Sequence, residues 1–384
     1  MRETENRMLM WYVILVIVVI STVCGLVYLG SRVACFGRRD GKDSGAHRRN
    51  RIVGFSIVLL VFVVLSLLMN LMNAIVCLLH FVVLWLLSDL TFSLMQRIRK
   101  RPFAHYYAGW TAILFSVVSL AAGWYLDHQV WATSYVIESD KVGNRLRLIV
   151  FADSHIGTTF DSSGFARHLR RMQAYQPDAV LIAGDFVDDG TSRDEMTASC
   201  RALGQLETKY GVYFAMGNHD KGYHDPAARG FTGDDLVAEL QKNKVRVLQD
   251  ETVLVGNRFY VAGRKDVSEI LRGGFRVETA ELLRGLDTEK FVAVVDHQPN
   301  DYEKQAAAKA DLVVSGHTHG GQLFPLNKVG EWIGANDKTY GHERRNVTDF
   351  IVTSGLSDWA IKFKTGTKSE FVVIDIVPRG ASES

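Results

Sequence analysis

Hydrophobic residues are distributed unevenly along this chain. Residues 10–29 carry no formal charge, and residues 52–94 carry a single one, Asp89. Both runs are longer than a buried helix of a soluble protein requires, and their length is typical of membrane-spanning helices. After about residue 130 the apolar runs become short and alternate with polar and charged residues. We therefore expect a transmembrane region in residues 1–130 and a separate α/β domain after it.

The apolar region is predicted to contain four spans. The run at 52–94 is too long for one span and is interrupted by Asn70 and Asn73, which predicts a helical hairpin with spans at 53–71 and 74–94. The other spans are expected at 10–29 and 107–126. The last of these is flanked by aromatic residues, as is typical of membrane interfaces: Tyr106, Tyr107, Trp124, Tyr125 and Trp131. The first run is long and lacks a clear cleavage site, which favours an uncleaved span over a signal peptide. Residues 131–145 are interpreted as a polar linker.

Positive charge is concentrated in two loops of this region, at 31–51 and 97–101. The positive-inside rule places such loops in the cytoplasm. With four spans, both termini then lie outside, and we expect a multi-pass protein of the cell membrane with an extracytoplasmic C-terminal domain.

Two ionisable residues, His80 and Asp89, fall inside a predicted span. Because such groups are costly in lipid, they are candidates for a transport or relay role. The simpler interpretation is that Asp89 pairs with the arginine-rich loops and that neutral His80 bonds to a neighbouring helix.

Composition narrows the function of the C-terminal half. The net charge of +2 and the absence of a basic stripe give no indication of a nucleic-acid surface. Cys24, Cys35 and Cys77 lie in or beside the apolar runs, so Cys200 has no partner for a disulfide within the soluble half. Cysteine usage therefore does not identify the redox compartment.

From residue 146 onward, five short apolar segments each run into a polar cluster. These segments are 146–152, 180–183, 212–216, 291–295 and 312–314, and we interpret each as a buried strand. Segments 164–175 and 193–209 have helical length, so strands and helices alternate as in an α/β layered fold. Ligands of such sheets gather beyond the carboxyl ends of the strands. The five polar clusters are therefore expected to converge on one site.

The polar clusters supply oxygen and nitrogen donors and no thiolate. Seven side chains make up this set: Asp153, His155, Asp185, Asn218, His297, His317 and His319. Such a set suits Mn, Fe or Zn. Seven ligands are too many for one tetrahedral ion but fit two ions about 3.5–4 Å apart that share a carboxylate, and Asp185 is the natural bridge.

These residues resemble the calcineurin-like metallophosphoesterases, whose blocks are D-x-H, GD-x-x-D, GNH-D/E, H-x-P and GH-x-H. Every block is present in order, beginning at Asp153, Gly184, Gly217, His297 and Gly316. Gly320-Gly321-Gln322 further resembles a bacterial membrane-associated subgroup with N-terminal transmembrane helices. Members of that subgroup often carry a later Gly-Leu-Gly segment followed by Pro and Arg. Here residues 354–359 read SGLSDW and lead to Lys362 and Lys364 instead.

The resemblance implies a four-layer α/β/β/α sandwich over residues 146–384. It also implies that one ion is held by Asp153, His155, Asp185 and His319, and the other by Asp185, Asn218, His297 and His317. In the family's reaction a metal-bound hydroxide attacks phosphorus, and His219 protonates the leaving alkoxide or contacts the phosphoryl oxygen. Near pH 7 an imidazole suits proton transfer.

Three acids near these blocks have less certain roles. Asp220 either orients His219, as a second catalytic residue, or caps a turn. Asp188 and Asp189 either support ligands or are solvated loop acids, and the second interpretation is favoured. His224, which follows closely, is a candidate for contact with substrate. Gly184, Gly217 and Gly316 are expected to allow close backbone approach or positive φ beside the metals.

The function favoured by these observations is a membrane-anchored, two-metal phosphoesterase. A phosphodiesterase or pyrophosphatase acting on a lipid-linked substrate is the economical interpretation, with a UDP-2,3-diacylglucosamine-type hydrolase as the alternative suggested by relatives. Aromatic residues at Trp332, Tyr340 and Trp359 either touch acyl chains or are buried in packing, and the second is the commoner case. A metal-dependent sensor on a membrane unit and a metal-binding scaffold without turnover are the other classes considered. The oligomeric state is not predicted.

Overall fold

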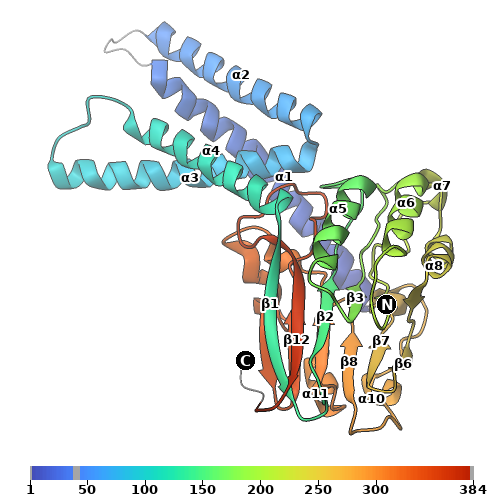
Figure 1. The fold of residues 1–384 in the computed structure, drawn as a ribbon. Helices are drawn as coiled ribbons and strands as arrows, with labels where there is room; N and C mark the ends of the chain where they lie inside the picture. Colours follow the sequence, from blue (N-terminus) through green and yellow to red (C-terminus); the bar gives the residue numbers. More distant parts are fainter. Residues whose placement is uncertain (1, 38–43, 381–384) are drawn as a thin grey trace. The chain divides into compact units, whose positions relative to one another are not determined.

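The computed structural model describes residues 2–37 and 44–380. The chain divides into two compact units, Met1–Ala122 and Gly123–Ser384 (Figure 1).

Four long helices account for nearly all of the first unit. They are α1 (Arg2–Val33), α2 (Ser44–Leu68), α3 (Leu71–Arg99) and α4 (Tyr107–His128), with a short 3-10 helix η1 (Ala34–Gly37) after α1. All four are long and apolar enough to cross a membrane, which confirms the prediction of four apolar helices. Many of their large apolar side chains are exposed, such as Leu15, Leu60, Leu90 and Leu114. Exposure of this kind suits a lipid environment rather than water.

The break between α2 and α3 lies where the asparagines predicted a hairpin. Asn70 caps α3, and its side-chain oxygen accepts a hydrogen bond of 2.9 Å from the backbone N–H of Asn73.

Asp89 and His80, which both fall inside α3, have partners in the described part of the chain. Asp89 lies 2.9 Å from Nε of Arg32 and accepts a hydrogen bond of 2.8 Å from the Tyr28 hydroxyl, so the pairing of Asp89 with the first basic loop is confirmed. His80 differs from the prediction. Its Nδ1 lies 3.0 Å from the carbonyl oxygen of Val76, one turn earlier on the same helix, rather than on a neighbouring helix.

The predicted polar linker at 131–145 is wrong for most of its length. Val130–Ser139 forms strand β1, which pairs in parallel with β12 (Ser369–Pro378) along its whole length, as Figure 1 shows. The segment reads VWATSYVIES, and its apolar positions at Val130, Ile137 and partly Tyr135 face the protein interior. Its polar residues suit the edge of a sheet, which is why the segment resembled a connector.

The second unit contains two six-stranded mixed sheets. The first has the order β1, β12, β2 (Leu146–Phe151), β3 (Ala179–Ala183), β4 (Val212–Ala215) and β5 (Val245–Val247). The second has the order β10 (Gly341–Arg345), β11 (Thr348–Val352), β9 (Leu312–Ser315), β8 (Phe291–Val295), β7 (Phe259–Gly263) and β6 (Glu251–Val255). All five predicted strands are present. Strands β2, β3, β4 and β5 are parallel, as are β7, β8, β9 and β11, so their carboxyl ends meet at one edge of each sheet.

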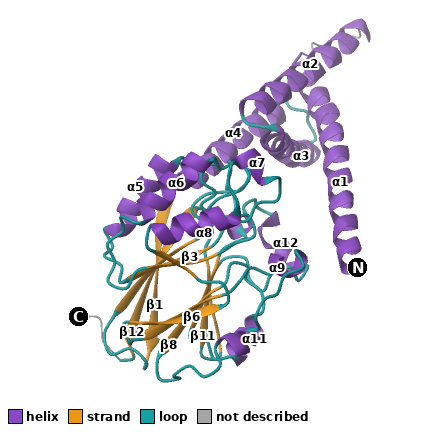
Figure 2. Ribbon diagram, turned by 90° about the vertical axis from the view of Figure 1, so that its right-hand side faces the viewer, coloured by secondary structure: helices purple, strands orange, loops and turns teal. Residues whose placement is uncertain are grey.

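Alternate residues of these strands pack into different layers. Leu148 and Val150 join Phe259 and Ala293 in the core between the sheets, whereas Ile149 and Phe151 face the other side. That outer face is covered by α5 (Ser162–Gln173), α6 (Arg193–Leu203) and α8 (Gly233–Lys242), as Figure 2 shows. The outer face of the second sheet is covered by α10 (Thr279–Leu282) and α11 (Tyr302–Ala307). The four-layer α/β/β/α arrangement is therefore confirmed.

The remaining short elements lie in loops: α7 (Pro226–Arg229), α9 (Ser268–Leu271), η2 (His319–Gly321), η3 (Leu326–Lys328) and α12 (Val329–Trp332). Helix α6 is shorter than predicted and ends at Leu203. The next residue is Gly204, where a Cβ atom would lie 2.9 Å from the backbone oxygen of Asn243.

Candidate metal centre

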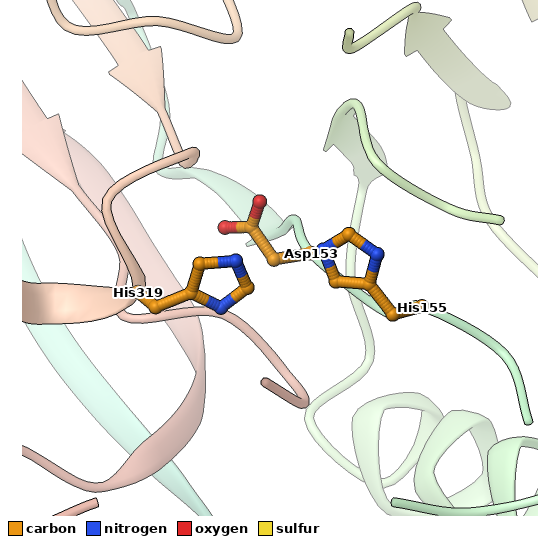
Figure 3. Close-up of side chains that lie close together, drawn as sticks. All are labelled: Asp153, His155 and His319. Atoms are coloured by element: carbon orange, nitrogen blue, oxygen red, sulfur yellow. The ribbon is translucent and has the colours of Figure 1, made fainter. Parts of the chain in front are cut away.

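Titratable side chains gather in two adjoining groups at the carboxyl ends of the strands. Asp153, His155 and His319 form the first group, and Figure 3 shows their side chains converging. Asp185, His297 and His317 form the second. Within each group, one potential ligand atom from every residue lies within 4.8 Å of the others.

Both sheets contribute to this site. Asp153 and His155 follow β2, Asp185 follows β3 and Asn218 follows β4, all in the first sheet. In the second sheet, His297 follows β8 and the residues His317 and His319 follow β9. The packing of one sheet on the other therefore brings together residues that are more than 160 positions apart in the chain, such as Asp153 and His317, whose backbone N–H donates to the Asp153 carboxylate.

Asp185 lies at the junction of the two groups. Its Oδ2 atom is 3.1 Å from Nε2 of His297 and 3.8 Å from Nε2 of His155. The Asn218 side-chain oxygen is 3.0 Å from the same nitrogen of His297. A carboxylate oxygen between two histidines from different groups has the position that a bridging ligand needs.

The backbone is strained at five of the seven residues predicted as ligands. Positive φ angles occur at Asp153 (52°), His155 (37°), Asp185 (52°), His317 (70°) and His319 (49°). Residues other than glycine rarely adopt this left-handed region, and each instance costs on the order of 1–3 kcal/mol. Such strain concentrates at functional sites, where it aims side chains that ordinary backbone could not.

Two glycines let the backbone approach the carboxylates closely. A Cβ atom at Gly217 would lie 2.2 Å from Oδ1 of Asp185, and one at Gly316 would lie 2.6 Å from Oδ2 of Asp153. In turn, the backbone N–H groups of His219 and His317 donate hydrogen bonds to Asp185 and Asp153, respectively. The prediction that these glycines permit close approach is confirmed.

The donor atoms suit divalent ions. His155 is fully buried, and its Nε2 atom makes no hydrogen bond with any described residue. A buried ring nitrogen without a hydrogen bond is costly unless another group occupies it. Carboxylate and amide oxygens with imidazole nitrogens are the donors that Mn, Fe and Zn bind in proteins. The residues present therefore fit a pair of such ions.

Charges inside the site shift several pKa values. Burial alone would raise the pKa of Asp185, but the neighbouring charge and hydrogen bond of His297 hold it well below its ordinary range. Conversely, burial opposes the charged form of His297, whereas Asp185 raises the pKa of His297 well above its ordinary value. These opposite directions describe a tightly coupled buried pair in which a carboxylate faces an imidazole.

His219 lies beside the first group without being part of it. Its ring centre is 5.1 Å from that of His155, 5.0 Å from that of Tyr223 and 5.3 Å from that of Trp359. Burial lowers the pKa of His219 to about 4. The His219 imidazole is therefore neutral near pH 7.

Asp220 does not orient His219, which corrects one of the two alternatives. Its carboxylate accepts four backbone N–H bonds, from Asp185, Phe186, Val187 and Gly217, at 2.7–3.2 Å. The carboxylate fixes the turn that carries Asp185, so the turn-capping interpretation is the correct one. Burial and the nearby charge of Asp185 raise the pKa of Asp220 to about 7, while the N–H donors act in the opposite direction.

The two acids after Asp185 differ from each other. Asp188 is buried, and its Oδ2 atom lies 3.4 Å from Nδ1 of His155, so the favoured interpretation of a solvated loop acid is wrong for this residue. Asp189 lies nearer the surface and is 3.0 Å from Nδ1 of the exposed His224. His224 therefore belongs to a loop contact with Asp189.

Asp358 contacts the site, and Lys364 pairs with Asp358, although neither residue was predicted to take part. Oδ1 of Asp358 lies 3.2 Å from Nδ1 of His319 and 3.2 Å from Nζ of Lys364. Both Asp358 and Lys364 are completely buried. The only signal in the sequence is that this segment, SGLSDW, departs from the pattern of the resembled subgroup.

Two further residues support Asn218. The Tyr223 hydroxyl accepts a hydrogen bond of 2.8 Å from the Asn218 side-chain nitrogen. Arg272 donates to the carbonyl oxygens of Asn218 and Gly222, at 3.2 and 2.9 Å. Neither residue lies in a motif, so spacing alone could not identify them.

Comparison with known proteins identifies related sequences for the second unit. The model of the calcineurin-like phosphoesterase family matches residues 146–321. An uncharacterized metallophosphoesterase of Aquifex aeolicus is 31% identical over 217 residues, which cover 55% of this chain and 78% of the relative.

Two other relatives are longer. A transmembrane protein with metallophosphoesterase domain from Danio rerio is 33% identical over 48% of this chain and 42% of its own length. An uncharacterized metallophosphoesterase of Campylobacter jejuni is 26% identical over 62% of this chain and 61% of its own length. The chain thus spans less than two thirds of these two relatives.

Proposed function

Because the chain belongs to the calcineurin-like phosphoesterase family, we propose that its second unit is a metal-dependent phosphoric ester hydrolase. The observation that carries this proposal is the pair of ligand groups that adjoin at Asp185, with His219 beside them. Phosphoryl transfer needs positioned positive charge more than covalent catalysis, and a two-cation site supplies that charge.

The proposed ligand sets follow the two groups. Asp153, His155 and His319 would hold one ion, and His297, His317 and Asn218 the other, with Asp185 shared between them. Two divalent ions in these positions would polarise phosphoryl oxygens and lower the pKa of water towards neutral. Manganese, iron and zinc are the metals that suit these donors.

His219 is proposed to donate a hydrogen bond to the substrate in its neutral form. Since burial lowers its pKa to about 4, the ring carries one N–H and no charge at neutral pH. The family resemblance allows either protonation of the leaving group or contact with a phosphoryl oxygen. A neutral imidazole supports the second role.

Asp358 is proposed to position His319. The Ser357 carbonyl oxygen lies 3.1 Å from Nδ1 of His319, and the Asp358 carboxylate lies 3.2 Å from it. Together they favour the tautomer in which Nδ1 carries the proton, and Nε2 is then free to bind a metal. Lys364 compensates the charge of Asp358 and also donates to the Ser354 carbonyl oxygen at 2.6 Å, which fixes this carboxylate in place.

We propose a phosphodiester or pyrophosphate in a lipid-linked molecule as the substrate. The support is that the same chain carries four helices long and apolar enough to cross a membrane. A UDP-2,3-diacylglucosamine-type substrate belongs to the same chemical class. The basic loops at 31–51 and 97–101 support a cell-membrane protein with the hydrolase on the extracytoplasmic side.

The test of this function uses the full chain in detergent. After removal of metals with a chelator, it is reloaded with Mn, Zn, Fe or Mg and assayed with 4-nitrophenyl phosphate and bis(4-nitrophenyl) phosphate. We expect turnover that depends on metal, about two ions bound per chain, and loss of both ions in Asp185→Ala. A fully metallated protein without turnover of either ester would contradict a hydrolase and favour a scaffold.

A further inference from the structure

The end of α4 lies at the same edge of the first sheet as the metal centre. Residues Gly123–His128 of this helix belong to the second unit, and β1 begins directly afterwards at Val130. Val130 pairs with Ser369 of β12, and Val372 of β12 pairs with Val150 of β2. Because β12 and β2 are antiparallel, Ser369 lies three residues beyond this pair in the direction of the end of β2 that leads to Asp153. The last turn of an apolar helix therefore reaches the level of the metal centre.

A short series of contacts joins this helix end to a proposed metal ligand. The backbone N–H of Lys364 donates a hydrogen bond of 2.9 Å to the carbonyl oxygen of Gly123. The Lys364 ammonium lies 3.2 Å from Asp358, which in turn lies 3.2 Å from His319. Asp127, in the last turn of α4, also accepts from the Thr159 hydroxyl, close to His155 in sequence.

Exposed apolar side chains follow in the chain segment that bonds to Thr365. Thr365, next to Lys364, accepts a hydrogen bond from the backbone N–H of Phe324 at 3.0 Å and donates its own N–H to the Gln322 carbonyl oxygen. The segment that follows η2 carries four large apolar side chains, which we call the apolar rim: Phe324, Leu326, Trp332 and Ile333. Each of them is 63–72% exposed. The expectation that Trp332 is buried in packing is therefore wrong.

The neighbouring surface has the composition of a membrane interface. Trp124 and Tyr125 of α4 are exposed, and Trp131 follows in β1. Lys368 lies over the Trp131 ring, and the exposed Lys328 lies within the rim segment. Aromatic rings and lysines concentrate where a protein meets lipid headgroups, and anionic headgroups attract the lysines.

From this arrangement we propose that the apolar rim inserts into the interfacial layer of the membrane in which α4 ends, and that the metal centre opens onto that layer. The partner is a lipid surface, identified by four exposed apolar side chains that continue from the aromatic end of a candidate span. A lipid with a phosphodiester at the headgroup level then reaches the metal centre without leaving the bilayer. This statement about the substrate rests on the function proposed above, whereas the position of the rim does not.

The position of the rim is tested by fluorescence of the full chain in liposomes. A single environment-sensitive dye is attached through Trp332→Cys, with Cys24, Cys35 and Cys77 replaced by alanine and the buried Cys200 retained. The matched control carries the dye through Glu289→Cys, at the opposite end of the sheets just before β8. We expect blue-shifted emission and quenching by nitroxide-labelled lipids only at position 332. Water-like emission at both positions would overturn the proposal.

A double variant, Phe324→Ser with Trp332→Ser, tests whether the rim is needed for turnover of a lipid substrate. It is assayed on a phosphodiester lipid in the same liposomes and on soluble bis(4-nitrophenyl) phosphate. We expect lipid turnover to fall about tenfold or more through the loss of buried apolar surface, with soluble turnover unchanged. Equal effects on both substrates would contradict a membrane role for the rim.

The two experiments distinguish an error in the proposed membrane insertion of the rim from an error in the proposed function. If the wild-type chain hydrolyses neither ester but the dye at position 332 is quenched, the rim inserts and the proposed reaction is wrong. If soluble ester is hydrolysed and the dye is not quenched, the reaction holds and the rim does not insert.

Discussion

The carboxylate of Asp358 lies 3.2 Å from Nδ1 of His319, and both side chains are buried beside the proposed metals. A carboxylate–histidine–metal arrangement raises the basicity of the imidazole and fixes its orientation. Asp358 would thus influence the metals without contacting them.

Substitution Asp358→Asn should weaken metal binding while the fold persists. Outer carboxylates of this kind typically contribute about 10- to 100-fold to metal affinity. Competition with a chromophoric chelator measures this affinity, and circular dichroism checks the fold. Asp189→Asn is the matched control, since the partners of Asp189 among the described residues are exposed His224 and the backbone N–H of Tyr223, neither of them a proposed ligand. Equal affinities in the two variants would remove Asp358 from the proposed role.

Substitution His219→Ala should retain both metals and lose most hydrolysis, by about 10²- to 10⁴-fold in kcat. His219→Gln keeps an N–H donor, so it should retain more activity than the alanine variant if His219 donates a hydrogen bond in its neutral form. Metal content by mass spectrometry accompanies both rate measurements. Identical losses in the two variants would instead favour proton transfer, and unchanged rates would place His219 outside the reaction.

Replacing Gly217 with alanine should disrupt the site through a single methyl group. The new Cβ would lie 2.2 Å from Oδ1 of Asp185, and the carboxylate would have to move. We expect loss of metal at both sites, or a lower unfolding temperature if the turn cannot adjust. Gly143→Ala is the control, because no atom lies within 4 Å of its Cβ position. The idea fails if Gly217→Ala binds two metals as the wild type does.

Stability should decrease between neutral and mildly acidic pH in part through His168. Burial, followed by the charges of Arg171 and Arg167, lowers the pKa of His168 from 6.5 to about 4. Between these values the unfolded chain binds a proton that the folded chain does not, so this contribution is complete above pH 6.5 and is lost as pH falls towards 4. Unfolding temperatures of wild type and His168→Gln from pH 7.5 to 5 measure it. Parallel curves for the two proteins would contradict the assignment.

The sequence pattern was sufficient for the alternation of strands and helices and for the gathering of polar clusters at strand ends, whereas the four layers were implied by the family resemblance. Buried parallel strands are short apolar runs whose carboxyl ends share one edge of a sheet, so Asp153 and Asp185 were predictable as neighbours. Strand β1 was not predictable in the same way. Its residues alternate between interior and surface at the edge of a sheet, a pattern that resembles a polar connector.

Burial of charge was the other feature that spacing could not reveal. Asp358 and Lys364 have the composition of an exposed loop, yet they pair in the interior because η2 and the end of α4 pack against the same segment. The sequence locates Asp220 at the site but leaves two roles open for it. Its partners are backbone N–H groups, which are not visible in the pattern of side chains. Tertiary contacts of this kind are not encoded in local patterns.

The left-handed backbone at five proposed ligands has a consequence for how the site would come apart. A peptide held in a costly conformation returns to an ordinary one as soon as its restraints are removed. In this protein the restraints are shared, because Asp220 fixes the turn of Asp185 and Asp153 fixes the turn of His317. Release of one turn would therefore free its neighbours, and the centre should dismantle as a unit rather than shed its ligands one at a time.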